Sequence, residues 1–173
     1  MNEVLEAIRT RRSIKKYKPD LPEQALIEQV AEAGTYAASG MNAQSPIILA
    51  VTNKALRDRL SALNAAVLGG SGDPFYGAPA VLVVLADKAR PTRIYDGSLV
   101  MGNMMLAAHA LGLGSCWIHR AKEVFESDEG KAILEELGVE GEYEGIGNLV
   151  LGYADGEAPA AKPRKDGYIR YVK

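Results

Sequence analysis

The sequence has few of the residues that build disulfides and metal sites. Its 173 residues contain one cysteine, Cys116, and two histidines, His109 and His119. A lone cysteine excludes an internal disulfide and favours a reducing, cytoplasmic setting. Cys116 has no neighbouring base, so we expect a buried, unreactive thiol rather than a nucleophile. Because the potential ligands are few and scattered, we expect no metal site, and we expect His109 to be hydrogen-bonded within the core.

The sequence also lacks an excess of charge of either sign and a long apolar run. Twenty basic and 22 acidic residues leave a formal net charge of −2, so we expect neither a nucleic-acid partner nor a membrane partner held by bulk charge. Glu3 and Glu6 interrupt the N-terminal segment, which therefore does not resemble a signal peptide. The longest apolar stretch, residues 99–114, contains Asn103 and His109 and is too short and too polar to span a membrane.

The spacing of apolar residues and the positions of turn-forming residues predict a series of helices and strands. The length suits a single domain over residues 1–173. Apolar residues at helical spacing predict helices around residues 4–8, 26–33, 56–67 and 98–111, and a charged, exposed helix over 126–138. Short β-branched or continuously apolar runs predict strands over 45–53, 80–87, 114–119 and 145–155. Their order predicts an α+β fold with a mixed central sheet and helices packed on both faces.

Two segments stand apart from this pattern. Residues 69–77 form a loop rich in glycine, whose role the sequence does not indicate. Residues 156–173 read as an extended C-terminal tail, because Ala-Pro and Lys-Pro units favour extended backbone. Within the tail, residues 168–172 alternate like one more strand, with no obvious partner nearby in the sequence.

Four polar stretches are candidates for a binding site. Arg11, Arg12, Lys15 and Lys16 lie within six positions, either to bind an anion or simply to face water near a helix C-terminus. Ser39, Asn42 and Gln44 follow a helix end and can donate and accept hydrogen bonds at the edge of a ring, although an ordinary loop would look alike. The third stretch is the strand end at residues 116–120. Lys162 and Arg164 flank Pro163 in the tail, where a solvated linker is the alternative.

A dinucleotide-binding reading of Gly112 and Gly114 fails. These glycines leave a helix and enter a strand, which is the reverse of the strand-to-helix turn that places a pyrophosphate at a helix N-terminus. Serine-hydrolase signatures are also absent.

In order along the chain, the four stretches resemble the motifs of the nitroreductase family of flavoprotein oxidoreductases. "AIRTRRSIKKYKP" is similar to the N-terminal Arg-Arg-Ser-x-Arg signature, and "AASGMNAQSP" resembles the second motif, Ser-x-x-Asn-x-Gln-Pro. "AAHALGLGSCWI" resembles the third motif, and "GYADGEAPAAKPRK" resembles the closing segment. Two departures stand out: Lys15 replaces an arginine and keeps the charge without the bidentate fork, and Ser45 is inserted before Pro46.

The resemblance implies a fold, a cofactor and a reaction. It implies a nitroreductase-like homodimer with an exchanged C-terminal tail, two FMN groups at the interface, and NADH or NADPH as electron donor. It further implies reduction of small acceptors such as nitroaromatics or quinones, by ping-pong kinetics, because donor and acceptor would use one stacking site in turn. A non-catalytic flavin-binding protein for storage or sensing stays open as an alternative, since such enzymes lack diagnostic catalytic side chains.

The same resemblance implies roles for individual residues. Arg11, Arg12 and Lys15, with Arg164, would surround the FMN phosphate and the pyrimidine end of the ring, and Lys15 would tune the flavin. The backbone N–H of His119 or Arg120 would meet N5. The loop from Ser39 to Gln44 would face the flavin from the second subunit. The full set of implied cofactor-binding residues is Arg11, Arg12, Ser13, Lys15, Ser39, Gly40, Met41, Asn42, Gln44, Trp117, Ile118, His119, Arg120, Lys162 and Arg164.

Overall fold

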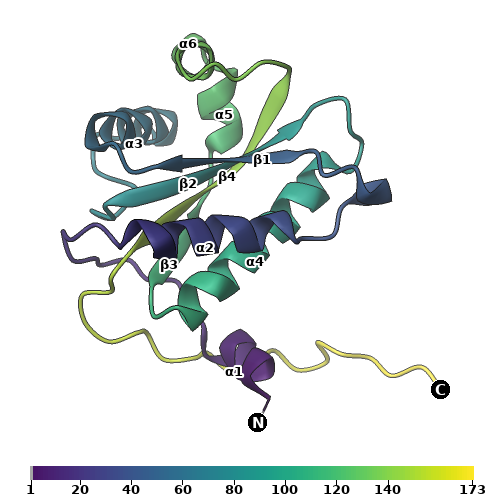
Figure 1. Cartoon of the computed structure of the whole chain (residues 1–173). Helices are drawn as coiled ribbons and strands as arrows, with labels where there is room; N and C mark the ends of the chain where they lie inside the picture. The colour runs from purple at the N-terminus through teal and green to yellow at the C-terminus, as the bar shows by residue number, and fades with distance from the viewer. Residues whose placement is uncertain (1) are drawn as a thin grey trace.

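The protein is built on a four-stranded sheet with helices on both faces, seen in a computed structural model that describes residues 2–173 (Figure 1). The strand order is β1-β2-β4-β3, and all three ladders are antiparallel. The α+β class predicted from the sequence is confirmed, but the four described strands pair only antiparallel instead of forming the mixed sheet that we expected. Parallel pairing within the described residues is limited to one bridge, Ser13 to Ser115. The strands are β1 (Pro46–Val51), β2 (Ala80–Asp87), β3 (Gly114–Ile118) and β4 (Tyr143–Gly152).

The two central strands are the most fully buried. β2 is buried along nearly its whole length, as its unbroken apolar run predicts, and β4 beside it is buried as well. β1 and β3 form the two edges of the sheet. Each face of β2 therefore belongs to a different apolar core: Val83 and Leu85 pack into one, and Leu82 and Val84 into the other.

The helices divide between these two cores. α2 and α4 cover one face of the sheet, and α3, α5 and α6 cover the other, while α1 contacts the C-terminal end of α4 (Figure 1). Three helices begin at a side-chain cap supplied by Asn2, Asn53 or Ser127. Their bounds are α1 (Glu3–Thr10), α2 (Gln24–Thr35), α3 (Lys54–Leu68), α4 (Arg93–Ala110), α5 (Ala121–Glu126) and α6 (Asp128–Glu136).

The helix predictions need two corrections. α4 begins at Arg93, five residues before the predicted Ser98, because its first turn carries polar groups such as Asp96 that hide the apolar pattern. The helix predicted over 126–138 is confirmed as α6, but the sequence missed α5, which lies directly before it and ends at Ser127, the residue that caps α6. The two short helices pack so closely that a Cβ on Gly130 would lie 2.0 Å from the Val124 carbonyl oxygen.

The C-terminal tail leaves the body of the protein. Residues 156–173 form no helix or strand and are exposed, and Figure 1 shows them passing α1 and running away from the sheet. The strand predicted over 168–172 is not formed within one chain, where it has no neighbouring strand. Its pairing with another copy stays a prediction. No helix in residues 2–173 combines the length and apolarity needed to cross a bilayer.

Candidate cofactor site

The basic segment after α1 is fixed across the ends of two strands. The Ile14 N–H donates to the Ser115 carbonyl of β3 at 3.0 Å, and the Lys18 N–H donates to the Tyr153 carbonyl beyond β4 at 2.9 Å. Gly114 makes room for this crossing, because a Cβ there would lie 3.1 Å from the Ile14 side chain. The predicted site residues 11–15 are therefore held at one end of the sheet.

Tyr17 anchors the same segment from within. Its buried hydroxyl donates to the Ile14 carbonyl at 2.7 Å. Burial raises the pKa of Tyr17 far above its ordinary value, and the nearby Cys116 and Tyr76 raise it further. The hydroxyl is therefore protonated at neutral pH and available as a donor.

Two cavities border the candidate motifs, one of about 430 Å³ and one of about 290 Å³. The smaller cavity is the one beside Arg11 and Arg12, and it lies between the ends of α1 and α4 and the start of the tail. Thr10, Arg11, Arg12, His109 and Ser115 all line the smaller cavity. His109 is hydrogen-bonded, with Nε2 2.8 Å from Thr10 Oγ1, but it is half-buried at the cavity wall rather than within the core as we expected. Five polar or charged side chains, from residues 10–12, 109 and 115, thus converge on one small space.

The two arginines differ in how they are used. Arg12 Nη1 donates to the carbonyls of Arg9 and Arg11, both at 2.8 Å. Arg11 Nη1 is buried and has no hydrogen-bond partner within residues 2–173. Because a buried, charged donor without a partner is costly, Arg11 Nη1 indicates an anion that the chain itself does not supply.

Lys15 lies at the rim, beside the 69–77 loop. It is exposed, and its Nζ lies 5.5 Å from the centre of the Tyr76 ring. Asp73 fixes the loop by accepting hydrogen bonds from the Arg57 guanidinium at 2.7 Å and from the Gly77 N–H at 2.7 Å. Burial raises the pKa of Asp73, but these bonds outweigh it and the pKa is lowered overall. One structural role of the loop is thus to place Tyr76 next to Lys15.

The second motif lies at the other end of α4. Met41, Asn42 and Gln44 all have positive φ angles, between 49° and 55°, which non-glycine residues adopt rarely. The loop is held by the Asp96 carboxylate, which accepts from the Gly40 N–H at 2.9 Å, and by Ser39 Oγ, which accepts from the Gln44 N–H at 3.0 Å.

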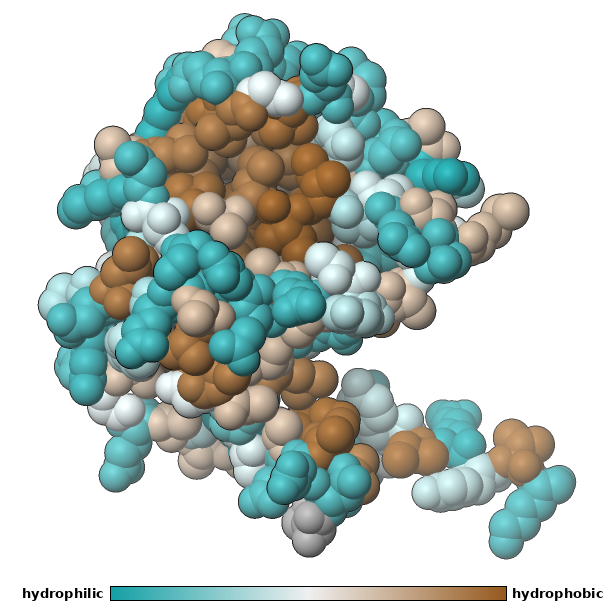
Figure 2. All heavy atoms as spheres, viewed as in Figure 1, coloured by the Kyte–Doolittle hydropathy of each residue, from teal (hydrophilic) through white to brown (hydrophobic). Residues whose placement is uncertain are grey.

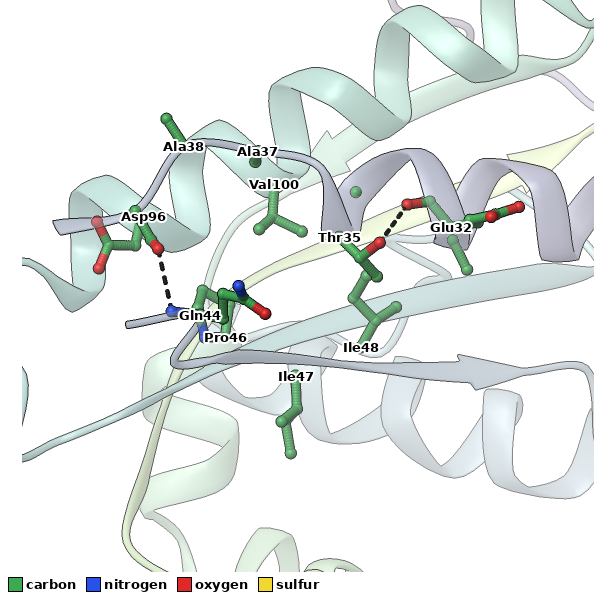
Figure 3. A pocket seen from close by; sticks show the side chains of 13 residues that line it. Glu32, Thr35, Ala37, Ala38, Gln44, Pro46, Ile47, Ile48, Asp96 and Val100 are labelled. Carbon is green, nitrogen blue, oxygen red and sulfur yellow. Dashed lines mark hydrogen bonds between the residues drawn. The ribbon is translucent and has the colours of Figure 1, made fainter. Parts of the chain in front are cut away.

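The second motif also borders the larger cavity, which opens between α2, β1 and α4 (Figure 3). Ile48 points from β1 toward Thr35 on α2, while the side chain of Ile47 points to the opposite side of the strand. The inserted Ser45 leaves its Oγ buried without a partner among the described residues.

The first and second motifs do not meet within one chain. Asp96, which holds the second loop, and His109, which lines the arginine cavity, are 13 residues apart on the same helix. At 1.5 Å per residue, they lie about 20 Å apart along α4. A single chain therefore brings Arg11, Arg12 and Ser115 together but leaves the Ser39–Gln44 loop apart from them.

The strand end at residues 117–120 offers backbone rather than side chains. Trp117 and Ile118 pack into opposite cores, so their side chains are structural. Neither the His119 N–H nor the Arg120 N–H donates a hydrogen bond to any residue in the range 2–173. Both donors are therefore free for a ligand.

The tail cations are not brought to the arginine cavity. Lys162 and Arg164 are exposed, and Arg164 Nη2 donates to the Lys162 carbonyl at 2.9 Å. No cluster of three or more His, Cys, Asp or Glu side chains suited to a metal occurs in the described part of the chain. Sequence reasoning missed Tyr17, Asn64, Asp96 and Asn148, which hold the site in shape. Only their contacts in the fold distinguish them from ordinary polar residues.

Known proteins of similar sequence cover the same elements. The model of the nitroreductase family matches residues 8–70 and 67–153. A protein of Archaeoglobus fulgidus, provisionally named as an NADH dehydrogenase/NAD(P)H nitroreductase, is 32% identical over 163 residues, which are 91% of this chain and 88% of that protein. A protein of Methanothermobacter thermautotrophicus with the same name is 32% identical over 120 residues, and the match covers 66% of this chain and 60% of that relative's length.

Two solved structures extend the match to the whole chain. The FMN-bound nitroreductase from Bacteroides fragilis has a TM-score of 0.92 at 29% identity, and the FMN-bound nitroreductase from Desulfitobacterium hafniense has a TM-score of 0.90 at 30% identity. Each match covers 100% of both chains. With the family model spanning most of the sequence and a relative at 32% identity spanning 91% of it, the chain belongs to the nitroreductase family.

Proposed function

We propose that this protein is an FMN-dependent oxidoreductase that uses NADH or NADPH to reduce small acceptors such as nitroaromatics or quinones. The observation that carries the proposal is the buried, unpartnered Nη1 of Arg11 in a cavity shared with Thr10, Arg12 and Ser115. This donor set suits a phosphate, which accepts several charge-assisted hydrogen bonds at once. The FMN-bound structures of similar fold support the choice of anion.

Each part of the site has a proposed task. Arg11 holds the phosphate, and Arg12 shapes the cavity by bonding two backbone carbonyls. Lys15 places a cation at the pyrimidine end, where it favours the reduced, more negative ring. The free N–H of His119 or of Arg120 would donate to N5. FMN, when bound, supplies the electron-transfer chemistry, so no side chain of this protein is needed as an acid or base.

We further propose that the working form is a homodimer. Because the two motifs lie about 20 Å apart along α4, only a second copy can place the Ser39–Gln44 loop beside the first copy's arginines. Exposed apolar side chains support this arrangement. They lie on α1 (Val4, Leu5, Ile8), on α4 (Ile94, Tyr95, Leu99) and on the second loop (Met41).

The test of the function is a reduction and reoxidation cycle. The purified protein is expected to be yellow, and its flavin band is expected to bleach with NADH or NADPH without oxygen and to return with a nitroaromatic or a quinone. This cycle alternates donor and acceptor at one site, which predicts ping-pong kinetics. A protein that bleaches with dithionite but not with either nicotinamide would instead be the non-catalytic flavin-binding protein.

The two arginines give a matched pair of variants. Arg11→Ala removes the unpartnered donor, and losing a charge-assisted hydrogen bond of about 1.5–3 kcal/mol weakens FMN binding about ten- to a hundredfold. Arg12→Ala removes bonds to backbone carbonyls and is expected to weaken binding less. The measurement is the FMN dissociation constant, from the recovery of flavin fluorescence on dilution. Equal constants for Arg11→Ala and the parent would remove Arg11 from the phosphate site.

A further inference from the structure

The turn after β3 adopts an unusual backbone conformation at a single residue. Arg120 has φ of 73° and directly precedes α5, so the chain passes from strand to helix through one left-handed residue. A non-glycine residue in this region is strained and persists only where its surroundings hold it. The contacts around the turn show what holds it.

Two buried asparagines bond the carbonyl of the preceding residue. Asn64 of α3 is fully buried, and its Nδ2 donates to the His119 carbonyl at 2.8 Å. Asn148 of β4, also buried, donates weakly to the same carbonyl at 3.4 Å. The other end of Asn64 accepts from Arg120 Nε at 3.0 Å. Its orientation is unambiguous, because a carbonyl only accepts and a guanidinium only donates.

This arrangement sets the direction of one backbone donor. In a trans peptide the C=O and the N–H point to opposite sides, and no peptide bond within residues 2–173 is cis. Since the His119 carbonyl faces the buried amides, the N–H of the same peptide, which belongs to Arg120, faces the other way. That N–H donates to no group in residues 2–173.

We propose that Asn64 is a positioning residue: it fixes the His119–Arg120 peptide so that the Arg120 N–H is held ready for the flavin. The inference rests on the proposed FMN site and deepens it by choosing Arg120 over His119 as the donor and by naming what aims it. A donor held in place before the ligand arrives needs no reorganisation during the reaction. Asn64 lies in α3, outside all four motifs, and touches the ligand only through this peptide.

The proposal is tested with two variants of Asn64. Asn64→Leu removes both hydrogen bonds. Asn64→Asp keeps the size and the bond from Arg120 but cannot donate to the His119 carbonyl. A displacement of about 1 Å costs up to a hundredfold in rate, so we expect single-turnover reduction of bound flavin by NADH or NADPH to slow tenfold or more in both variants. The FMN dissociation constant should change less than threefold, since the phosphate cavity is untouched.

A second readout does not depend on activity. Hydrogen exchange of the Arg120 amide, followed by NMR in the FMN-bound protein, should be at least tenfold faster in Asn64→Asp than in the parent. Asn53→Ala is the matched control: it removes an asparagine that caps the same helix by accepting from the Leu56 N–H at 3.0 Å, far from the turn. It should keep the parent's reduction rate and amide protection.

The outcomes separate this inference from the proposed function. If Asn64→Asp reduces its flavin and protects the Arg120 amide as the parent does, the positioning role is wrong, whether or not Asn64→Leu folds. If the parent itself binds no FMN or is not reduced by either nicotinamide, the proposed function fails irrespective of Asn64. Slower reduction and loss of protection in Asn64→Asp, with FMN retained and the control unchanged, would establish the role.

Discussion

Gly145→Ala is expected to destabilise the protein by about 3 kcal/mol and to lower its melting temperature by about 6–12 °C. A Cβ at Gly145 would lie 2.3 Å from both the carbonyl carbon and the oxygen of Ala121, and 2.8 Å from the Lys122 nitrogen. These are backbone atoms, so no side-chain rotation relieves the clash. α5 would have to move away from β4, and the turn before it would move as well.

The measurement is a thermal melt of the FMN-bound protein, and Gly70→Ala is the control. Gly70 has nothing within 4 Å of its added Cβ and does not have a positive φ angle. It should melt within about 2 °C of the parent, since open surface sites tolerate substitution. A Gly145→Ala protein that melts with the control would mean that α5 and β4 are not packed as closely as the structure has them.

The bulge around Gly145 also shows what sequence patterns leave out. The apolar run in β4 predicted a strand, and the strand is there. Its register, however, shifts between Val84 and Leu85, whose partners are Gly147 and Gly145, so Ile146 is an extra residue. The Gly-Ile-Gly pattern indicates a flexible backbone, but it does not indicate which other segment packs against Gly145. That information comes from α5, which the sequence did not reveal as a separate helix.

The candidate site was also predicted only in part from the sequence. Continuous apolar runs and helical spacing predicted most of the elements, because burial on one or both faces leaves a period in the sequence. The motifs located the polar segments. Neither distinguishes Arg11 from Arg12, which are neighbours of the same type, yet only Arg11 has a buried Nη1 without a partner. No sequence pattern indicated a role for Asn64, because that role depends on the His119 carbonyl, which lies 55 residues away along the chain.

Removing the tail is expected to have the largest effect on the cofactor site. Truncation after Asp155 should convert a homodimer into a monomer by light scattering and reduce FMN content to less than a tenth of the parent's. The removed residues make no regular structure within their own chain, and four apolar side chains near the end are exposed: Tyr168, Ile169, Tyr171 and Val172. Such a segment gains little stability until it pairs with a strand of a second copy.

We propose that the tail of one copy pairs with the edge strand β1 of the other copy. The outer edge of β1 has no other strand of the described chain beside it, and Figure 2 shows an apolar hollow over β1 between α6 and α2. A cavity of about 420 Å³ there is lined by Leu49, Val51, Leu56 and Leu137 among others. An unpaired edge beside apolar surface is a template for another strand. The 12 residues from 156 to 167 reach about 40 Å when extended, enough to cross to a neighbouring subunit.

Two full-length variants separate the strand from the cations that precede it. Ile169→Asp places a charge in the proposed strand and keeps Arg164, so it should weaken the dimer and, with it, FMN binding. Arg164→Ala keeps the strand and should leave the dimer intact while weakening FMN binding about tenfold, as one lost contact to a phosphate does. The truncation removes both contributions and should exceed either variant. If the truncated chain stays dimeric and keeps its full FMN complement, the tail neither joins the subunits nor completes the site, and the exposed apolar faces of α1 and α4 alone would have to hold the dimer together.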